Sequence, residues 1–295
     1  MIYCVIIVKK TTGRKIASYD YWTYKITSKQ IKKYLSLRDE VSKNSRALKT
    51  GPIAIDNFKF ISCDCTNDIL LIFVCNVIIP DGELIDTIGK AEKVMRKAIA
   101  EQSQQDIKRD FFKLIDQLVL TRLVIALVGD SGVEKTSLLH LLTGRRPPKE
   151  HRLTIVVNTE LIENIRFANH QIVIIDYAGQ EKSRKLWDFS NADMIFLITD
   201  STLKNLIVSK GLISQIKKQR ENVPIYVFAN KQDLPNSLDP SAIGKVLGIE
   251  AESMVAVDLA YRNNLMKSLV RILCNYFDVE VPQILPDELF GFDSD

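Results

Sequence analysis

Apolar and polar positions follow two different rhythms in the two halves of the chain. In the first half, short extended patterns dominate, and we expect strands at residues 2–8, 15–22, 53–55, 58–64 and 69–77. Apolar positions spaced three and four apart, or polar helix-favouring sequence, predict helices at about 28–49, 84–98 and 104–120. The resulting order, β-β-α-β-β-β-α-α, is typical of a small α+β domain.

The second half alternates strictly between apolar strands and helical patterns. Strands are predicted at 124–128, 172–176, 194–200, 225–230 and 254–257. Helices are predicted at about 136–143, 181–190, 202–220, 239–247 and 263–277. This alternation predicts a parallel-type sheet with helices on both faces, and ligands bind beyond the carboxyl ends of such strands. We therefore expect two domains, 1–120 and 121–280. Residues 281–295 form an acidic, aromatic tail, of which 286–295 are predicted to be disordered, with a short docking peptide as the alternative.

Composition and charge narrow the possible partners and compartment. The chain has 295 residues, enough for two cores. The basic residues form no run of five or six, which argues against a nucleic-acid partner. The first 122 residues carry 21 basic and 14 acidic side chains, which is compatible with peripheral membrane association. No apolar run reaches the roughly 18 residues of a transmembrane helix. The five cysteines favour free thiols in a reducing, cytoplasmic setting.

The first chemical motif follows the strand predicted at 124–128. Residues 129–136, GDSGVEKT, match the phosphate-binding pattern G-x-x-x-x-G-K-[ST] except at Glu134. A strand, a glycine-rich turn and a helix start place backbone N–H groups around an anion, and Lys135 adds a positive charge. The sequence therefore predicts a phosphate cradle with a carboxylate in it.

Further motifs lie at the ends of later predicted strands. Asp176 and Thr136 are candidate Mg²⁺ ligands, and Thr154, after a polar loop, is a third. The N–H of Gly179 is placed to contact a terminal phosphate, and Gln180 to orient an attacking water. All of these residues belong to the chemistry of phosphoryl transfer.

The sequence NKQD at 230–233 is a candidate for base recognition. The Asp233 carboxylate can accept two hydrogen bonds from guanine N1–H and its exocyclic amine, which adenine does not offer. Asn230 can contact N7, and the stem of Lys231 can lie over the base. The N–H of Ala260, after the last predicted strand, is a candidate partner for guanine O6.

The segments LTIVVNTELIE, DYAGQEKSRKLW, FANKQDLP and SAIGKVLGIE, within about 122–280, resemble the Arf-like branch of the Ras superfamily of small GTPases. This resemblance implies a GTP- or GDP-binding domain with Mg²⁺, slow GTP hydrolysis, and protein partners such as an exchange factor, an activating protein and effectors. It implies that Gln180 is catalytic and that Thr136, Thr154 and Asp176 serve the metal. The implied nucleotide contacts are Gly129, Asp130, Ser131, Gly132, Val133, Glu134, Lys135, Thr136, Ser137, Thr154, Gly179, Asn230, Lys231, Asp233 and Ala260.

The opening segment IYCVIIVKKTTGRKIASYDYW and the later ILLIFVCNVIIPDGELIDTIGKAEKVMRKAIAE resemble longin domains, which occur in trafficking proteins. The resemblance implies an α+β module without catalytic residues. Such a module would act on the GTPase domain in cis or in trans, in membrane trafficking or signalling.

Glu134 decides between two hypotheses. A non-glycine residue at positive φ costs on the order of 1–3 kcal/mol. A carboxylate roughly 5 Å from a phosphate charge costs on the order of 3 kcal/mol at an effective dielectric near 20. The first hypothesis is a GTP-operated switch that tolerates these costs. The second is a pseudo-GTPase scaffold with weak or no nucleotide binding. An ATP-using enzyme is disfavoured by residues 230–233.

Overall fold

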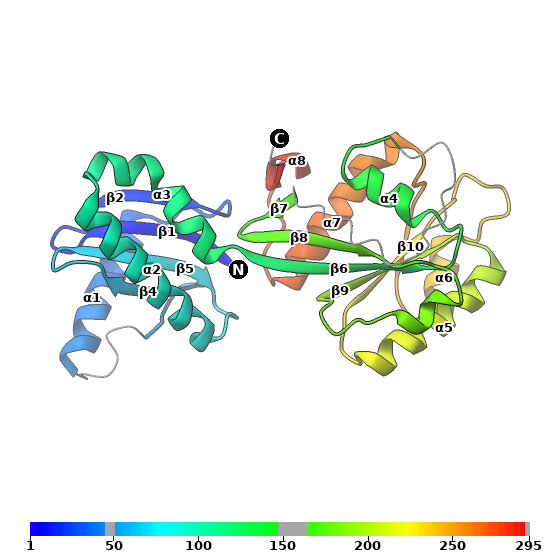
Figure 1. Ribbon diagram of the computed structural model, residues 1–295, viewed down its shortest axis with the longest axis horizontal. Coiled ribbons are helices and arrows are strands. Elements are labelled where there is room, and N and C mark those ends of the chain that lie inside the picture. Colours follow the sequence, from blue (N-terminus) through cyan, green and yellow to red (C-terminus); the bar gives the residue numbers. More distant parts are fainter. Residues whose placement is uncertain (45–50, 147–164, 293–295) are drawn as a thin grey trace. The chain divides into compact units, whose positions relative to one another are not determined.

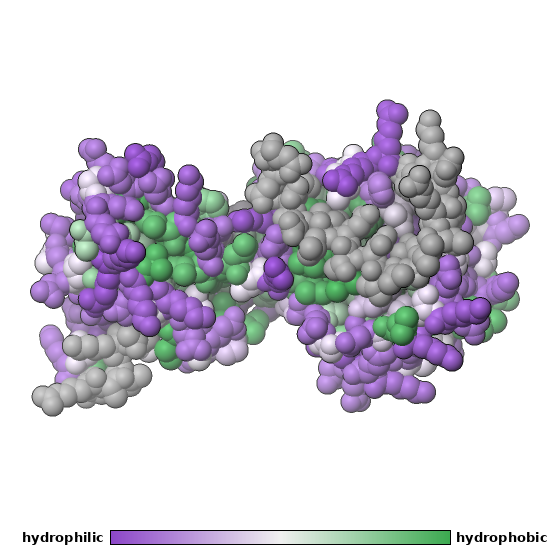
Figure 2. Space-filling view, viewed as in Figure 1, coloured by the Kyte–Doolittle hydropathy of each residue, from purple (hydrophilic) through white to green (hydrophobic). Residues whose placement is uncertain are grey.

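The computed structural model describes residues 1–44, 51–146 and 165–292, and they form two compact units (Figure 1). The first unit comprises Met1–Thr121 together with Phe167–His170. The second comprises the remaining described residues from Arg122 onward. On the face shown in Figure 2, hydrophilic residues predominate over hydrophobic ones among the described residues at the outer edges of each unit.

The first unit confirms the predicted order of elements. Its strands are β1 (Ile2–Lys9), β2 (Lys15–Asp20), β3 (Ile53–Ile55), β4 (Phe58–Asp64) and β5 (Ile69–Asn76). Its helices are α1 (Ser28–Asn44), α2 (Asp81–Glu101) and α3 (Gln104–Val119). The strands form one antiparallel sheet in the order β2-β1-β5-β4-β3.

Both faces of this sheet are buried. Along β1, Val5 and Ile7 pack into a core with α2 and α3, while Cys4 and Ile6 pack into a second core with α1. Alternate side chains of a strand point to opposite faces, so one apolar run supplies both cores.

The five cysteines of the chain are buried free thiols, which confirms the free thiols predicted from their odd number and their apolar surroundings in the sequence.

The segment Phe167–His170 contributes a buried polar side chain to the first unit. Asn169 is 2% exposed, and its Oδ1 accepts a hydrogen bond from the N–H of Ile2 at 2.9 Å. Its Nδ2 donates to the backbone oxygen of Val119 at 2.8 Å. Phe167 packs edge-on against Trp22, with ring centroids 5.0 Å apart. A segment distant in sequence thus satisfies two backbone groups of the first unit.

Substituting Asn169 tests this contribution. Asn169→Ala is expected to accelerate amide exchange in β1 by about 10- to 100-fold, because two buried backbone groups lose partners at a cost of roughly 1–3 kcal/mol. Hydrogen–deuterium exchange of the full chain, read by mass spectrometry, measures the effect. Asn169→Asp keeps the acceptor for Ile2 and loses the donor for Val119, so its effect should be intermediate. Unchanged exchange in both variants would contradict the assignment.

The second unit is built around a seven-stranded sheet. Its strands are β6 (Thr121–Gly129), β7 (Ile165–Phe167), β8 (His170–Asp176), β9 (Met194–Thr199), β10 (Ile225–Ala229), β11 (Ala251–Ser253) and β12 (Phe290–Phe292). Its α-helices are α4 (Lys135–Leu142), α5 (Leu203–Gln219), α6 (Pro240–Leu247), α7 (Arg262–Tyr276) and α8 (Pro286–Leu289). Two short 3₁₀ helices, η1 (Ser183–Leu186) and η2 (Leu259–Tyr261), lie between them.

The sheet is largely parallel, as predicted, and helices lie on both faces. The strand order is β11-β10-β9-β6-β8-β7-β12, and β11, β10, β9 and β6 pair in parallel. The neighbours β7 and β8 are joined by two residues, a connection that only antiparallel strands allow. In Figure 1, α4 and α7 lie on one face and α5 and α6 on the other. The carboxyl ends of β6, β8, β9 and β10 therefore meet at one edge.

Three sequence predictions differ from this structure. The helix expected at 181–190 is only the 3₁₀ turn η1, because Trp187 and Phe189 are buried at alternating positions after it. The strand expected at 254–257 is β11 instead, paired with β10 from Ala251. The tail prediction is wrong for 286–292, where α8 and β12 form and Phe290 is 2% exposed. Burial of that ring and a place at the edge of β7 order this segment.

Candidate functional site

The phosphate-binding motif lies between β6 and α4, where the sequence predicts it (Figure 1). Gly129 ends β6, and a Cβ there would lie 2.5 Å from the backbone oxygen of Ile198, so no side chain fits. Glu134 occupies the position before α4 with φ 70° and ψ 39°. This is the left-handed region that glycine adopts at little cost and other residues rarely enter. A positive φ, with its cost for a non-glycine residue, is therefore present at Glu134.

The ammonium of Lys135 is turned toward the loop itself. Its Nζ donates to the backbone oxygens of Gly129 and Asp130 at 3.3 and 3.1 Å, and the residue is 7% exposed. Burial lowers the pKa of the Lys135 ammonium, while the carboxylates of Asp176 and Asp130 oppose that shift. A phosphate in the loop would give this desolvated cation an anionic partner.

The two described residues that the sequence predicts as metal ligands, at the start of α4 and the end of β8, lie side by side. The hydroxyl of Thr136 donates to Oδ2 of Asp176 at 2.9 Å, and Asp176 is 2% exposed. A hydroxyl and a carboxylate at this separation supply the oxygen ligands that Mg²⁺ prefers. The two residues therefore fit Mg²⁺ held jointly with phosphate oxygens. The third predicted ligand, Thr154, lies outside the described residues.

The base-recognition motif is tied to the phosphate loop by two side chains. Asn230 is fully buried, and its Nδ2 donates to the backbone oxygen of Val133 at 2.9 Å and to Oε2 of Glu134 at 3.0 Å. Lys231 Nζ donates to the backbone oxygen of Gly132 at 2.8 Å. It also lies 3.8 Å from Oε1 of Glu134. The carboxylate of Glu134 thus faces the base-recognition loop.

The two other residues predicted to contact the base are Asp233, which follows β10, and Ala260, which follows β11. Asp233 is exposed, with its carboxylate accessible to a ligand. Ala260 lies in η2, and its N–H donates to Oδ1 of Asp258 at 2.9 Å. That N–H is already used, so it reaches guanine O6 only if Asp258 releases it.

Residues 178–187 form the turn after β8, the switch turn, which packs directly on the phosphate loop. A Cβ on Gly179 would lie 2.5 Å from the backbone oxygen of Asp130 and 2.6 Å from the N of Ser131. Gln180, next in the chain, is half-buried. The structure therefore brings Gly179 to the loop that would hold the terminal phosphate.

Sequence reasoning missed two residues at this site. Ser201, buried at the end of β9, donates from its hydroxyl to the backbone oxygen of Asn230 at 2.6 Å. Arg184 in η1 contacts the phosphate loop through the carboxylate of Asp130. Ser201 lies outside the quoted motifs, and Arg184 lies within the segment DYAGQEKSRKLW but had no role assigned to it, so only the folded arrangement identifies their contacts.

Comparison with known proteins agrees with this geometry. The sequence model of the ADP-ribosylation factor family matches residues 111–273, more than half of the chain. The chain belongs to the ADP-ribosylation factor family. ADP-ribosylation factor-like protein 5 of Caenorhabditis elegans is 30% identical over 131 residues, which cover 43% of this chain and 71% of that relative. As an ADP-ribosylation factor (Arf) family member, the chain has a guanine-nucleotide-binding domain of the small GTPase type, and proteins of this family generally bind nucleotide with Mg²⁺.

The Arf family match covers the whole phosphate loop, the switch turn and the base-recognition loop. It begins within α3, so residues 1–110 lie outside it. Within the described residues, no helix combines the length and apolarity needed to cross a membrane.

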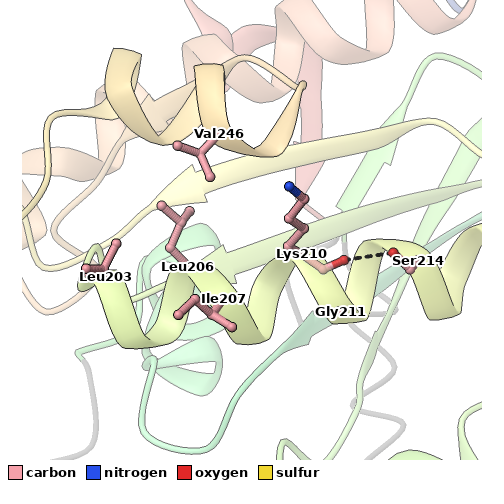
Figure 3. Close-up of a pocket in the computed structure, with 7 residues that line it drawn as sticks. All are labelled: Leu203, Leu206, Ile207, Lys210, Gly211, Ser214 and Val246. Atoms are coloured by element: carbon pink, nitrogen blue, oxygen red, sulfur yellow. Dashed lines mark hydrogen bonds between the residues drawn. The ribbon is translucent and has the colours of Figure 1, made fainter.

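A separate apolar groove lies on the Arf family unit between α5 and α6 (Figure 3). It encloses about 370 Å³ and is lined by Leu203, Leu206, Ile207, Lys210, Gly211, Ser214 and Val246. Figure 3 shows Val246 of α6 facing the α5 side chains across it. None of the predicted nucleotide-binding residues lines this groove.

Proposed function

We propose that the chain is a GTP-operated switch that hydrolyses GTP to GDP and phosphate slowly. Asn230 and Lys231 support this most directly, because both donate to backbone oxygens of the phosphate loop and so hold it against the base-recognition loop. A guanine nucleotide spans these two loops, with its phosphates in one and its base in the other. Members of the Arf family bind such nucleotides, which agrees with the arrangement.

Each motif has a role in the proposed cycle. The N–H groups of residues 129–137 and the ammonium of Lys135 bind the phosphates. Thr136 and Asp176, with Thr154, would hold Mg²⁺, and the ion would supply neutralising charge to the phosphate oxygens. Gly179 contacts the terminal phosphate, and Gln180 orients the attacking water. Loss of the terminal phosphate then removes the contacts that order the switch segments.

The unit at residues 1–120 is proposed to be a longin-like regulatory or partner-binding domain. Its five-stranded antiparallel sheet between α1 on one face and α2 and α3 on the other supports an α+β interaction module. It would act on the GTPase domain in cis or in trans, alongside an exchange factor, an activating protein and effectors. A cytoplasmic protein peripheral at a membrane, in trafficking or signalling, fits these features.

One observation favours a second candidate, a pseudo-GTPase scaffold. Glu134 combines a left-handed backbone with a carboxylate that already contacts Asn230 and Lys231. These contacts place a negative charge within the nucleotide site. Titration of the full chain with fluorescent GDP and GTP in the presence of Mg²⁺ separates the candidates. Saturable binding that unlabelled ATP does not compete supports the switch, and no binding at about 1 mM nucleotide supports the scaffold.

Asp233→Asn tests base recognition. We expect this variant to bind GDP at least about 100-fold more weakly, because an amide cannot accept both guanine hydrogen bonds and leaves a donor unpaired. Xanthosine diphosphate, which has a carbonyl in place of the guanine amine, should bind the variant better than the original chain. Competition titrations with both nucleotides measure the inversion. Retention of the guanine preference would remove Asp233 from the base contact.

A further inference from the structure

Asp130 and Arg184 form an ion pair between the phosphate loop and the switch turn. Nη2 of Arg184 lies 2.5 Å from Oδ1 of Asp130, and the two side chains are 17% and 30% exposed. Such a partly buried pair is screened less than a surface pair. Asp130 stands at a position where the phosphate-binding pattern requires no particular residue. Oδ1 of Asp130 also accepts a hydrogen bond from the N–H of Ser131 at 2.7 Å, so this carboxylate oxygen is directed at protein groups rather than at a phosphate.

The same guanidinium also holds the switch turn. Nε and Nη2 of Arg184 donate to the backbone oxygen of Gly179 at 3.3 and 3.2 Å. One side chain thus contacts both Gly179 and the loop residue Asp130, against which Gly179 packs too closely for a Cβ. The planar fork of arginine suits this bridging geometry, and lysine lacks it.

The backbone around Arg184 is anchored independently. Nε2 of Gln215, on α5, donates to the backbone oxygen of Arg184 at 3.0 Å. The buried Trp187 donates from its indole Nε1 to the backbone oxygen of Ala178 at 3.2 Å. These contacts fix both ends of the turn, so the guanidinium is presented to Asp130 from a supported segment.

We propose that Arg184 is a positioning residue of the nucleotide site, which with Asp130 latches Gly179 and Gln180 against the phosphate loop. This inference rests on the proposed function. The latch places the N–H that would contact the terminal phosphate and the side chain that would orient water. The groups that the latch positions would serve only the terminal phosphate and the attacking water. GTP hydrolysis therefore depends on the latch, and GDP binding does not.

The test uses Arg184→Ala, Asp130→Asn and the charge-swapped Asp130→Arg/Arg184→Asp in the full chain, with the exposed neighbour Lys185→Ala as the matched control. We expect single-turnover GTP hydrolysis to fall about 10-fold or more in both single variants, with GDP affinity changed less than about threefold. Arg184→Lys should rescue only part of the loss, the charge swap should restore more than either single variant, and Lys185→Ala should match the original chain.

Other outcomes overturn the latch. A direct contact of Arg184 with the phosphate would leave Asp130→Asn as fast as the original chain or faster. A purely structural role would weaken GDP and GTP binding equally. Hydrogen exchange of residues 178–187 without nucleotide provides a readout that does not depend on the proposed function. The latch requires faster exchange in both single variants, and unchanged exchange overturns it even if the chain binds no nucleotide.

Discussion

Replacing Glu134 by glycine is expected to tighten GDP and GTP binding by about two orders of magnitude. The carboxylate lies against Asn230 and Lys231, within the site that phosphate and base share. Its repulsion of a phosphate charge roughly 5 Å away is on the order of 3 kcal/mol at an effective dielectric near 20. The left-handed backbone exists without nucleotide, so its cost reduces stability rather than affinity. Glycine should therefore also raise stability, by up to about 1–2 kcal/mol after the lost contacts are offset.

Glu134→Gln is the matched control for this prediction. The amide keeps the size and the left-handed backbone and removes the charge, so it should tighten binding as glycine does without the gain in stability. Titration with fluorescent GDP and urea unfolding measure the two effects separately. Equal affinity in all three proteins would show that the carboxylate does not oppose the phosphates.

Replacing Lys135 by methionine is expected to separate binding from stability. Nucleotide affinity should fall by roughly three orders of magnitude, because an ammonium about 4 Å from a phosphate contributes on the order of 4 kcal/mol at a dielectric near 20. Stability should change little, because removal of a desolvated cation offsets the hydrogen bonds that two backbone oxygens lose. Burial of the Lys135 ammonium underlies both expected effects, the one on nucleotide affinity and the one on stability.

The pH dependence of Lys135→Met follows from the lowered pKa of Lys135 in the folded chain. Burying the charged form destabilises the original chain at pH values below its folded pKa, and the cost is relieved as pH rises from there toward the ordinary value of 10.5. Any advantage of methionine should shrink over that interval. Urea unfolding at several pH values measures it, with the exposed Lys204→Met as control. A large loss of stability at neutral pH would contradict this account.

The pattern of apolar positions was enough to predict most elements of both units, because it reports which faces are buried. The motifs at strand ends also predicted which loops meet, since parallel strands present their carboxyl ends to one edge. The features that the sequence did not mark at all share a cause. Nothing local marks β12 or the buried Asn169, because their partners are distant in sequence. Arg184 was missed for the same reason, and the direction of the Glu134 carboxylate followed only from the fold.

The place of Asn169 in the first unit has a consequence for dividing this protein. The unit is discontinuous in sequence, since the chain leaves it after Thr121 and returns to it at Phe167–His170. A fragment that ends at Thr121 lacks the side chain that satisfies Ile2 and Val119, and it leaves one face of Trp22 without Phe167. No single cut of the chain separates the two units cleanly. The smallest piece in which the first unit keeps all its own contacts extends to His170 and includes the phosphate loop.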